Sequence, residues 1–377
     1  MQQKRVDSAT TQSRDAPKAK WQKRAQQPAP FAFYPKDWTT VRTFDDKVSL
    51  LKARFTDRGG AQLIVKKILK IEPNSANDPK PLEMRALALL PRCNRIVHAL
   101  TCVASEDPEF GIALFEYYPS GDLAVWKDCE FDRKNFKQVP ESYIWRFFLQ
   151  MAQALASIQG EIGPVSVGQH LILHRDIKPK NVLVVDIGTT YPSFKLHDFG
   201  CATVWRQGKQ NQLSYCGTYD WQPPENPQIN TTAAEIWALG ACVHFLATGQ
   251  KPIANTEANR AACLERATRQ SGAVEERSSE RDYYSSSNRY CAAKVPRRVI
   301  PINLDAQTQL RRGIANRGFP NPQYSDELND WMTRCLQFEP ARRPTMEGLM
   351  SDMGAVAQGM LKRMGGAAAL ADMKVTF

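Results

Sequence analysis

The sequence of 377 residues lacks any apolar run that approaches the roughly 18 residues of a membrane span. It also lacks the apolar N-terminal region of a signal peptide. Its nine cysteines are scattered, odd in number and without a C-x-x-C pair. These absences predict a cytoplasmic or nuclear protein in a reducing compartment, with no membrane partner, disulfide framework or zinc site.

The charge is unevenly distributed in an otherwise average globular composition of 42% hydrophobic and 24% charged residues. The net charge is +11, and residues 1–33 are basic and polar with little periodicity, which predicts a disordered tail. Such a tail is either simply solvated or a patch for nuclear import or an anionic partner. No zinc finger, aromatic RNA motif or basic helix accompanies it, so nucleic acid is not an expected partner.

Two polar motifs follow each other in the middle of the chain. Leu-His-Arg-Asp-Ile-Lys-Pro-Lys-Asn covers residues 173–181, and His-Asp-Phe-Gly covers residues 197–200. Apolar runs at 182–185 and 194–196 predict two short strands with the motifs at their ends. The motifs bring together two acids, an amide and a lysine. This set suits phosphoryl transfer from ATP, which needs a base, oxygen ligands for Mg²⁺ and a cation.

The two motifs, in this order and spacing, resemble those of the eukaryotic protein kinase superfamily. The resemblance extends over residues 34–353. It implies an α+β, bilobal fold, with a small β-rich lobe over 34–118 and a larger, mostly helical lobe over 119–353. A helix is expected over 144–158, ahead of the first motif.

The resemblance also implies roles for the polar residues of the motifs. Asp176 would be the base that accepts the proton of the substrate hydroxyl, and Lys178 would steady the transferred phosphoryl group. Asn181 and Asp198 would hold Mg²⁺, which prefers oxygen ligands. The implied cofactors are therefore ATP and Mg²⁺.

A lysine and a glutamate of the small lobe complete the expected catalytic set. A strand over 62–68 carries adjacent lysines. Lys66 is in the position of the lysine that grips the ATP phosphates, and Lys67 is the alternative register. Glu83 opens an amphipathic stretch and is the expected helix carboxylate that pairs with Lys66. The alternative for Glu83 is a solvated surface residue.

An apolar strand over 113–117 resembles the strand and hinge beside which adenine lies in the family. The backbone from Glu116 to Tyr118 would offer hydrogen-bonding groups to the adenine. Val48 and Ile64 would cover the adenine from above, with Ile64 standing where the family has a small alanine. The larger side chain of isoleucine would crowd the space above the adenine.

Other departures concern the loop that covers the phosphates. Its three usual glycines are replaced by Val41, Thr43 and Asp46, whose side chains should hold the loop away from the nucleotide. Glu235 replaces the aspartate that braces the catalytic loop. Because no main catalytic group is lost, we expect an enzyme. The alternative is a pseudokinase-like scaffold with weak or no ATP binding.

Lys178 and the threonine at Thr218 follow the serine/threonine type of the family, so the expected substrate is a protein with a Ser or Thr acceptor. Residues 217–225 resemble the end of an activation segment. Within them, Glu225 is expected to pair with Arg343. Ser214 is the candidate regulatory phosphosite, with an ordinary loop serine as the alternative. The sequence leaves the oligomeric state open.

The remaining segments are expected to be peripheral. Residues 254–300 form a polar insertion, which is a tolerated surface loop or a docking element. Residues 354–377 contain a Gly-Gly-Ala-Ala-Ala stretch and are expected to be a flexible tail. Cys201 and Cys216 lie close to the motifs. They are expected to be small apolar filler, although sensitivity to oxidation is the alternative.

Overall fold

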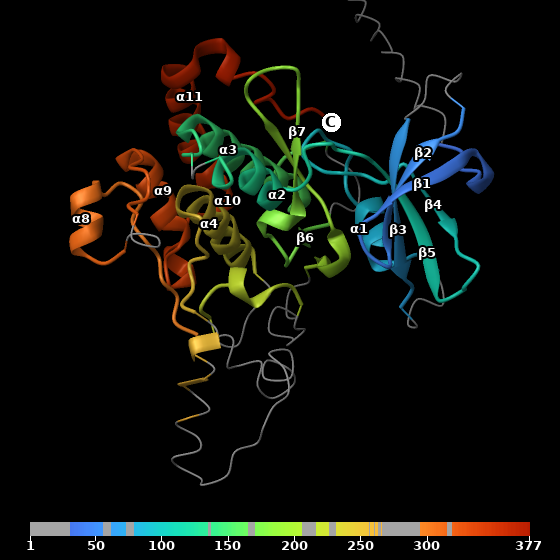
Figure 1. Cartoon of the computed structure of the whole chain (residues 1–377), viewed down its shortest axis with the longest axis horizontal. Helices are drawn as coiled ribbons and strands as arrows, with labels where there is room; N and C mark the ends of the chain where they lie inside the picture. Colours follow the sequence, from blue (N-terminus) through green and yellow to red (C-terminus); the bar gives the residue numbers. More distant parts are fainter. Residues whose placement is uncertain are drawn as a thin grey trace, which may run out of the picture.

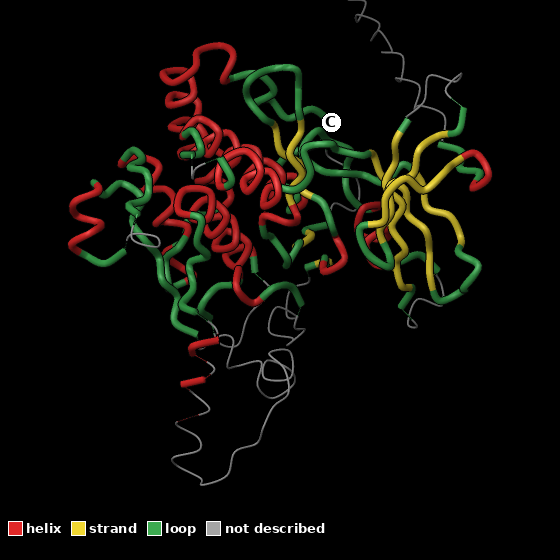
Figure 2. Tube along the Cα trace, viewed as in Figure 1, coloured by secondary structure: helices red, strands yellow, loops and turns green. Residues whose placement is uncertain are grey.

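The computed structural model describes residues 31–55, 62–72, 79–134, 137–164, 170–205, 216–225, 231–255, 257–259, 261–262, 265, 295–314 and 319–377. In this part of the chain a five-stranded sheet forms one lobe and helices dominate the other, so the α+β, bilobal fold is confirmed (Figures 1 and 2). Almost all of the expected basic tail and most of the 254–300 insertion lie outside the described residues. At the end of that expected tail, Phe31 and Phe33 pack on Trp38, with ring centroids 6.0 and 6.2 Å away.

The small lobe is built on an antiparallel sheet with strand order β1-β2-β3-β5-β4. Its strands are β1 (Trp38–Thr43), β2 (Val48–Ala53), β3 (Leu63–Lys70), β4 (Thr101–Ala104) and β5 (Phe110–Glu116). β3 and β5 are rich in β-branched and aromatic residues, which suit a pleated surface that is buried on both sides.

The two faces of this sheet are both apolar. On one face Val65 lies opposite Phe115, and both contact the main core of the molecule. On the other face Ile64 is fully buried with Leu51 and Leu114 in a separate small cluster. Successive side chains of a strand point to opposite faces, so the register of β3 decides which residues face the other lobe.

Helix α1 (Leu82–Ala88) connects the sheet to the second lobe. It starts after Pro81, whose fixed φ suits a helix N-terminus. Ala86 and Leu87 bury one side of α1 in the main core, and Glu83 is buried as well, with 3% of its surface exposed.

The larger lobe contains α2 (Leu123–Lys127), α3 (Glu141–Ile158), α4 (Thr232–Thr248), α8 (Ala306–Arg311), α9 (Asp326–Cys335), α10 (Met346–Gly348) and α11 (Gly354–Ala369). The expected helix over 144–158 is confirmed as most of α3, and it is buried nearly all round. α4 begins at Thr231, whose side chain accepts a hydrogen bond from the Ala234 amide, and ends at the left-handed Gly249. Among the described residues, no helix combines the length and apolar character that a bilayer crossing requires.

Two small strand pairs carry the polar motifs between the lobes. β7 (Val182–Val185) pairs with β8 (Ser193–Leu196), as the apolar runs predicted. β6 (Ile172–Leu173) pairs with β9 (Thr203–Val204). The two motifs therefore lie on neighbouring loops, each fastened by a strand on either side.

The prediction of a flexible tail over 354–377 is wrong. Residues Gly354–Ala369 form α11, which bends at Gly366, where φ is 58°. Leu361 and Ala369 are fully buried, and the following residues run along α3 toward the sheet lobe (Figure 1). The small residues that suggested flexibility instead permit close packing, since a Cβ on Gly365 would collide with the Tyr191 ring.

The packing of α4 on α9 gives a testable prediction. A Cβ on Gly240 of α4 would lie 2.7 Å from Cys335 Cβ and 3.1 Å from Leu336 Cγ. We expect Gly240→Ala to lower the free energy of unfolding by about 1–2 kcal/mol, because overpacking outweighs the better helix propensity of alanine. Urea unfolding followed by circular dichroism measures the difference.

The matched control is Gly359→Ala on α11, where nothing lies within 4 Å of the added Cβ. That variant should gain about 0.5–1 kcal/mol from helix propensity alone. Equal effects of the two substitutions would contradict the packing argument.

Candidate functional site

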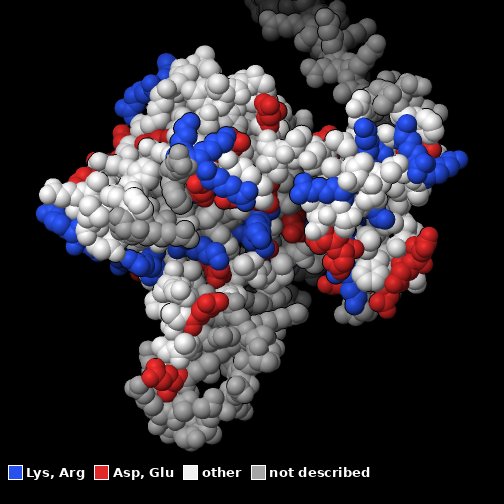
Figure 3. Space-filling model, in the orientation of Figure 1, with Lys and Arg blue, Asp and Glu red and all other residues white. Residues whose placement is uncertain are grey.

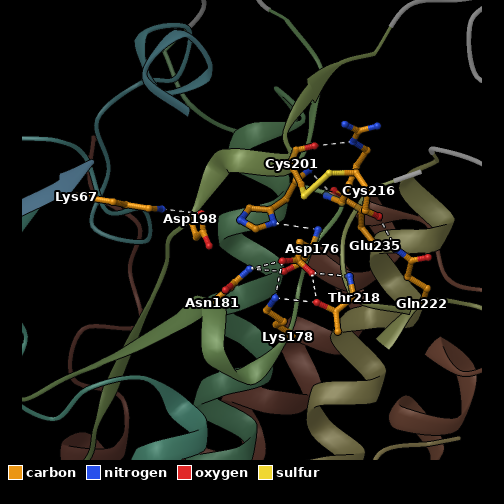
Figure 4. Close-up of a disulfide and its surroundings, with 12 residues drawn as sticks. Lys67, Asp176, Lys178, Asn181, Asp198, Cys201, Cys216, Thr218, Gln222 and Glu235 are labelled. Carbon is orange, nitrogen blue, oxygen red and sulfur yellow. Dashed lines mark hydrogen bonds and ion pairs between the residues drawn. A yellow bond between two sulfur atoms is a disulfide. The ribbon is translucent and has the colours of Figure 1, made fainter. Parts of the chain in front are cut away.

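One ammonium group joins three elements at the boundary between the lobes. Lys67 Nζ on β3 lies 2.7 Å from Glu83 Oε2 on α1 and 2.8 Å from Asp198 Oδ1 after β8. Figure 4 shows Lys67 and Asp198 extending toward each other from opposite sides. Burial opposes the charge of Lys67, but its two carboxylate partners outweigh burial and raise its pKa.

The prediction that Lys66 pairs with Glu83 is therefore wrong, and the alternative register is the observed one. Lys67 lies opposite Val48 on the face that meets the other lobe, whereas Lys66 lies opposite Ser49 on the other face. A shift of one residue along a strand exchanges the two faces. Both faces of β3 are apolar, so the pattern of apolar residues carries no signal that separates the two lysines.

The same shift corrects the expected roof of the nucleotide site. Ile64 lies on the outer face, in the small cluster with Leu51, and so does not face the other lobe. Val65 lies on the inner face, together with Val48. Val65 was therefore missed by the sequence analysis. Because valine is smaller than isoleucine, it leaves more room above the nucleotide site than the expected Ile64 would.

Asp198 is held in its charged form. Burial would raise the pKa of its carboxyl, but Lys67 outweighs burial and lowers it to about 2. Its backbone is left-handed, with φ at 64°, and its side chain is 36% exposed. Asp198 thus presents a partly accessible carboxylate beside the catalytic loop.

Asp176 lies at the centre of a hydrogen-bond network (Figure 4). Its Oδ2 accepts hydrogen bonds from Lys178 Nζ at 2.7 Å and Asn181 Nδ2 at 3.0 Å. Its Oδ1 accepts from the backbone N and Oγ1 of Thr218, both at 2.9 Å. Lys178 Nζ also donates to Thr218 Oγ1 at 2.8 Å. These bonds fix the direction of the Asp176 carboxylate.

The oxygen donors nearby fit a hard divalent cation. Asn181 uses its amide nitrogen on Asp176, with a second bond of 2.8 Å to the Asp176 carbonyl, which leaves Oδ1 as its acceptor atom. Asp198 adds an ionised carboxylate from the neighbouring loop. Such amide and carboxylate oxygens are ligands that Mg²⁺ accepts while keeping several waters.

His174 connects the two loops. Its Nε2 lies 3.0 Å from the His197 carbonyl and its Nδ1 accepts from the Asp176 amide at 3.3 Å. A neutral ring with its proton on Nε2 satisfies both bonds, and burial lowers the pKa of His174 in agreement. The ring also contacts Phe199, with centroids 4.8 Å apart.

Glu235 on α4 holds the catalytic loop from below. Its Oε1 accepts hydrogen bonds from the backbone amides of His174 and Arg175, and its Oε2 accepts from Gln159 Nε2 at 3.0 Å. Arg175 itself has a left-handed backbone, with φ at 67°. Burial raises the pKa of Glu235 to about 7. The bracing function expected for Glu235 is thus present in the geometry.

Gly217 allows Thr218 to reach Asp176. Its φ is 86°, and a Cβ there would lie 2.2 Å from the Arg175 carbonyl oxygen. Only glycine combines this backbone conformation with such a close approach. The close contact between residues 175 and 217 brings the end of the activation segment against the catalytic loop.

Cys201 and Cys216 form a disulfide, so their expected role as apolar filler is wrong, as is the expectation that the cysteines form no disulfide. The alternative, that these two cysteines are open to oxidation, agrees with the structure. Their Cα atoms are 5.8 Å apart, within the usual range for a bridge. Arg175 Nε donates to the Cys201 carbonyl at 2.6 Å and Gln222 Nε2 donates to the Cys216 carbonyl at 2.6 Å. Figure 4 shows the bridge beside the catalytic loop. The spacing of the cysteines in the sequence does not indicate this pair, because the two residues come together only when the chain folds.

The expected pair of Glu225 and Arg343 is confirmed. Two parallel bonds of 2.6 and 2.9 Å join the guanidinium to the carboxylate, and Arg343 Nη1 also donates to the Ala233 carbonyl. Arg343 lies over Trp237, which is fully buried and serves packing. Ser214, the candidate phosphosite, lies outside the described residues.

The glycine-poor loop is a tight hairpin turn between β1 and β2. Asp45 Oδ1 accepts from the backbone amides of Lys47 and Val48, both at 2.8 Å. Val41, Thr43 and Asp46 are exposed. Thr43 lies opposite Ser49, on the outer face of the sheet, so its side chain is directed away from Lys67. At the hinge, Tyr118 Oη donates to Glu116 Oε2 at 2.7 Å.

The raised pKa of Glu235 predicts a pH dependence of stability. The folded protein binds this proton more tightly than the unfolded chain, so the stabilisation is complete below pH 4.5 and is lost as pH rises through about 7. We expect the native chain to lose roughly 3 kcal/mol relative to Glu235→Gln between these limits. Urea unfolding of both proteins from pH 4.5 to 8 measures it.

The difference between the two proteins is the decisive quantity. Burial lowers the pKa values of His98, His197 and His244 to about 4, so these residues change stability with the opposite sign in the same range. They are common to both proteins and cancel in the difference. A difference independent of pH would contradict the buried, proton-binding carboxylate.

The disulfide gives a second prediction. It joins residues separated by 15 positions, and closing a loop of this length stabilises a fold by about 3 kcal/mol in the chain-entropy model. We expect dithiothreitol to lower the free energy of unfolding by that amount. Cys201→Ser/Cys216→Ser should not respond to the reductant, whereas Cys129→Ser, at an exposed free cysteine, should respond like the native chain. A native chain insensitive to reductant would contradict the bridge.

Comparisons with known proteins agree with this geometry. The family model described as the protein kinase domain matches residues 52–353. A mitogen-activated protein kinase kinase 2 of Arabidopsis thaliana is 32% identical over 143 residues, 37% of this chain and 34% of the relative. A dual specificity mitogen-activated protein kinase kinase mek-2 of Caenorhabditis elegans is 24% identical over 222 residues, 58% of this chain and 51% of the relative. An Aurora kinase of Eremothecium gossypii is 32% identical over 141 residues, 37% and 33% of the two chains. These matches span about half of the relatives' length or less.

Because the family model covers most of the chain and the motif residues converge at one site, this chain belongs to the protein kinase family.

Proposed function

We propose that this chain is an active serine/threonine protein kinase that transfers the γ-phosphoryl group of ATP to a protein hydroxyl. The observation that carries the proposal is the joining of Lys67 to both Glu83 and Asp198 beside the oriented carboxylate of Asp176. Lys67 and Asp198 are partly buried and Glu83 is buried, which is unfavourable for charged groups unless they are paired. The pairing raises the pKa of Lys67 and lowers the pKa of Asp198, whereas burial raises the pKa of Glu83.

In the proposed reaction the hydroxyl oxygen of the substrate attacks the γ-phosphorus of ATP. The bond from that phosphorus to the β,γ-bridging oxygen breaks, ADP leaves, and the hydroxyl proton passes to Asp176. Lys178 lies 2.7 Å from Asp176 and supplies a cation next to the transferred group. Lys67 binds the α- and β-phosphates, in place of the Lys66 first expected.

Asn181 and Asp198 would hold Mg²⁺, which offsets the negative charge of the phosphates when it is bound. Val48 and Val65, on the inner face of the sheet, would lie over the adenine, with the backbone of the hinge from Glu116 to Tyr118 at its edge. ATP and Mg²⁺ are thus the proposed cofactors.

The preference for serine and threonine is supported by Thr218 and Lys178. Their hydrogen bond of 2.8 Å places the threonine beside the base, where the serine/threonine type of the family has it. The relative from Caenorhabditis elegans is named as a dual specificity enzyme, so the test below also identifies the acceptor residue.

The alternative is a pseudokinase-like scaffold, and the hairpin without glycines favours it. The exposed side chains of Val41 and Asp46 stand where the family brings bare backbone to the phosphates. Thr43 is directed to the outer face and so weighs less than the sequence implied. The scaffold proposal requires that Mg·ATP at millimolar concentration fails to raise the melting temperature.

The adjacent lysines provide the test of the active-kinase proposal. We expect Lys67→Met to reduce phosphotransfer to Ser- and Thr-containing peptides on the order of 10²–10³-fold, because a preorganised cation is lost. Lys66→Met, its neighbour on the other face, should retain nearly full activity. Radiolabelled ATP and mass spectrometry of the product peptides measure the rate and identify the acceptor.

Lys67→Arg keeps the positive charge at this position. Melting curves of all variants distinguish a loss of phosphotransfer from a loss of folding. Omission of Mg²⁺ should abolish the activity of the native chain. Equal activity of Lys67→Met and Lys66→Met would contradict the proposed site. No phosphotransfer and no Mg·ATP stabilisation in the native chain would leave the scaffold function.

A further inference from the structure

Residues 369–377, here called the return segment, run from α11 back to the boundary between the lobes. Figure 1 shows the end of the chain lying between the helical lobe and the sheet lobe. Asn94, in the connection between α1 and β4, exchanges two hydrogen bonds with Thr376: its backbone N donates to Thr376 O at 3.1 Å, and its side-chain Oδ1 accepts from Thr376 N at 3.0 Å. The segment is therefore paired with a part of the chain more than 270 residues away.

Fully buried arginines bind this segment. Arg95 Nη1 lies 2.9 Å from Asp372 Oδ2, and its Nη2 donates to the carbonyls of Asp372 and Lys374. Arg146 Nη1 on α3 donates to the carbonyls of Ala369 at 2.6 Å and Ala371 at 2.7 Å. Both guanidinium groups are 0% exposed. A buried guanidinium needs acceptors, and the return segment supplies them.

The same polar side chains also hold β8. Arg146 donates to the carbonyl of Pro192 at 2.8 Å and to Ser193 Oγ at 3.0 Å. Gln150 donates to the Asp372 carbonyl at 3.0 Å and accepts from the Phe194 amide at 2.8 Å. At the other end of β8, the amide of Leu196 donates to the Arg95 carbonyl at 2.8 Å.

β8 leads directly to Asp198, two residues beyond Leu196. Arg95 thus contacts the return segment through its side chain and β8 through its backbone. Arg95 also follows α1, which carries Glu83. The two carboxylates that bind Lys67 are therefore both connected, through short stretches of chain, to the place where the return segment binds.

We infer that the return segment is a positioning element for phosphoryl transfer, with Asp372 and Arg95 as its central pair. Acting through Arg95, Arg146 and Gln150, it fixes the end of β8 and so the placement of the Asp198 carboxylate. This inference rests on the proposed kinase function and adds positioning residues outside the nucleotide site. Asp372 and Arg95 lie outside the proposed nucleotide site and act through β8.

The test uses Asp372→Asn in the full chain. Asn has the same shape and tolerates the left-handed backbone of residue 372, where φ is 53°, but it removes the charge that faces Arg95. We expect the Mg²⁺ concentration for half-maximal activity to rise about 10–100-fold, the range found when groups that support a metal ligand are changed. Lys374→Ala, in the same segment with an exposed side chain, is the matched control and should behave like the native chain.

Hydrogen exchange supplies a readout that does not depend on activity. Measured well below the melting temperature of each protein, amides in residues 193–198 should exchange faster in Asp372→Asn than in Lys374→Ala. Faster exchange confined to residues 369–377, or an unchanged Mg²⁺ requirement in an active enzyme, would overturn the inference and leave a purely structural clamp. If the native chain transfers no phosphate, the proposed function fails. The exchange in residues 193–198 then decides by itself whether the segment positions β8.

Discussion

The ion pairs of Lys67 constrain the rest of this fold. A partly buried ammonium group is favourable only with carboxylate partners close by. Glu83 and Asp198 come from α1 and from the loop after β8, so the sheet, the helix and the motif loop must all be placed correctly for one group to be satisfied. The register of β3, the position of α1 and the direction of β8 are therefore linked.

The same physical arrangement recurs around the site. Glu235 on α4 accepts backbone amides of the catalytic loop, and Arg343 holds Glu225 by two parallel bonds. In each case a buried ionisable side chain on the helical lobe fixes a loop that has little regular hydrogen bonding of its own. Arg95 repeats the pattern with the return segment. Loops that must keep one conformation are thus bound to groups whose desolvation makes any other arrangement unfavourable.

The sequence predicted this site best where chemistry and local structure coincide. The motifs at 173–181 and 197–200 depend on polar residues next to short β-branched runs, and β7 and β8 form where those runs lie. The Glu225–Arg343 pair followed from the family pattern and is present. The family pattern predicts Lys66 and leaves Lys67 as the alternative, and the sequence cannot separate them because both faces of β3 are apolar and no alternation marks the register. Composition alone cannot distinguish such a strand from its one-residue shift.

The other errors have a different physical origin. Neither the bridge between Cys201 and Cys216 nor the ordering of residues 354–377 is encoded in local sequence. Each depends on contacts between segments far apart in the chain. The Gly and Ala residues near position 366 have the composition of a flexible tail, yet the same small side chains allow close packing against Tyr191. The composition of a segment indicates which conformations it can adopt, and its tertiary contacts determine which of these conformations it does adopt.

The hairpin between β1 and β2 differs from the family pattern, whereas the residues expected to carry out transfer are present on other elements. Asp45 closes the turn through its side chain, so the hairpin forms without the usual glycines. Glycine backbone in this loop acts on ATP phosphates, whereas Lys67, Asp176 and Asp198 lie on other elements and keep their geometry regardless of the turn. Contacts made equally to ground state and transition state affect KM more than kcat. In the proposed kinase, the side chains in place of glycine in this hairpin would therefore weaken the affinity for ATP without removing the groups that carry out transfer. For that reason the paired charges of the site carry more weight in the proposal than the missing glycines.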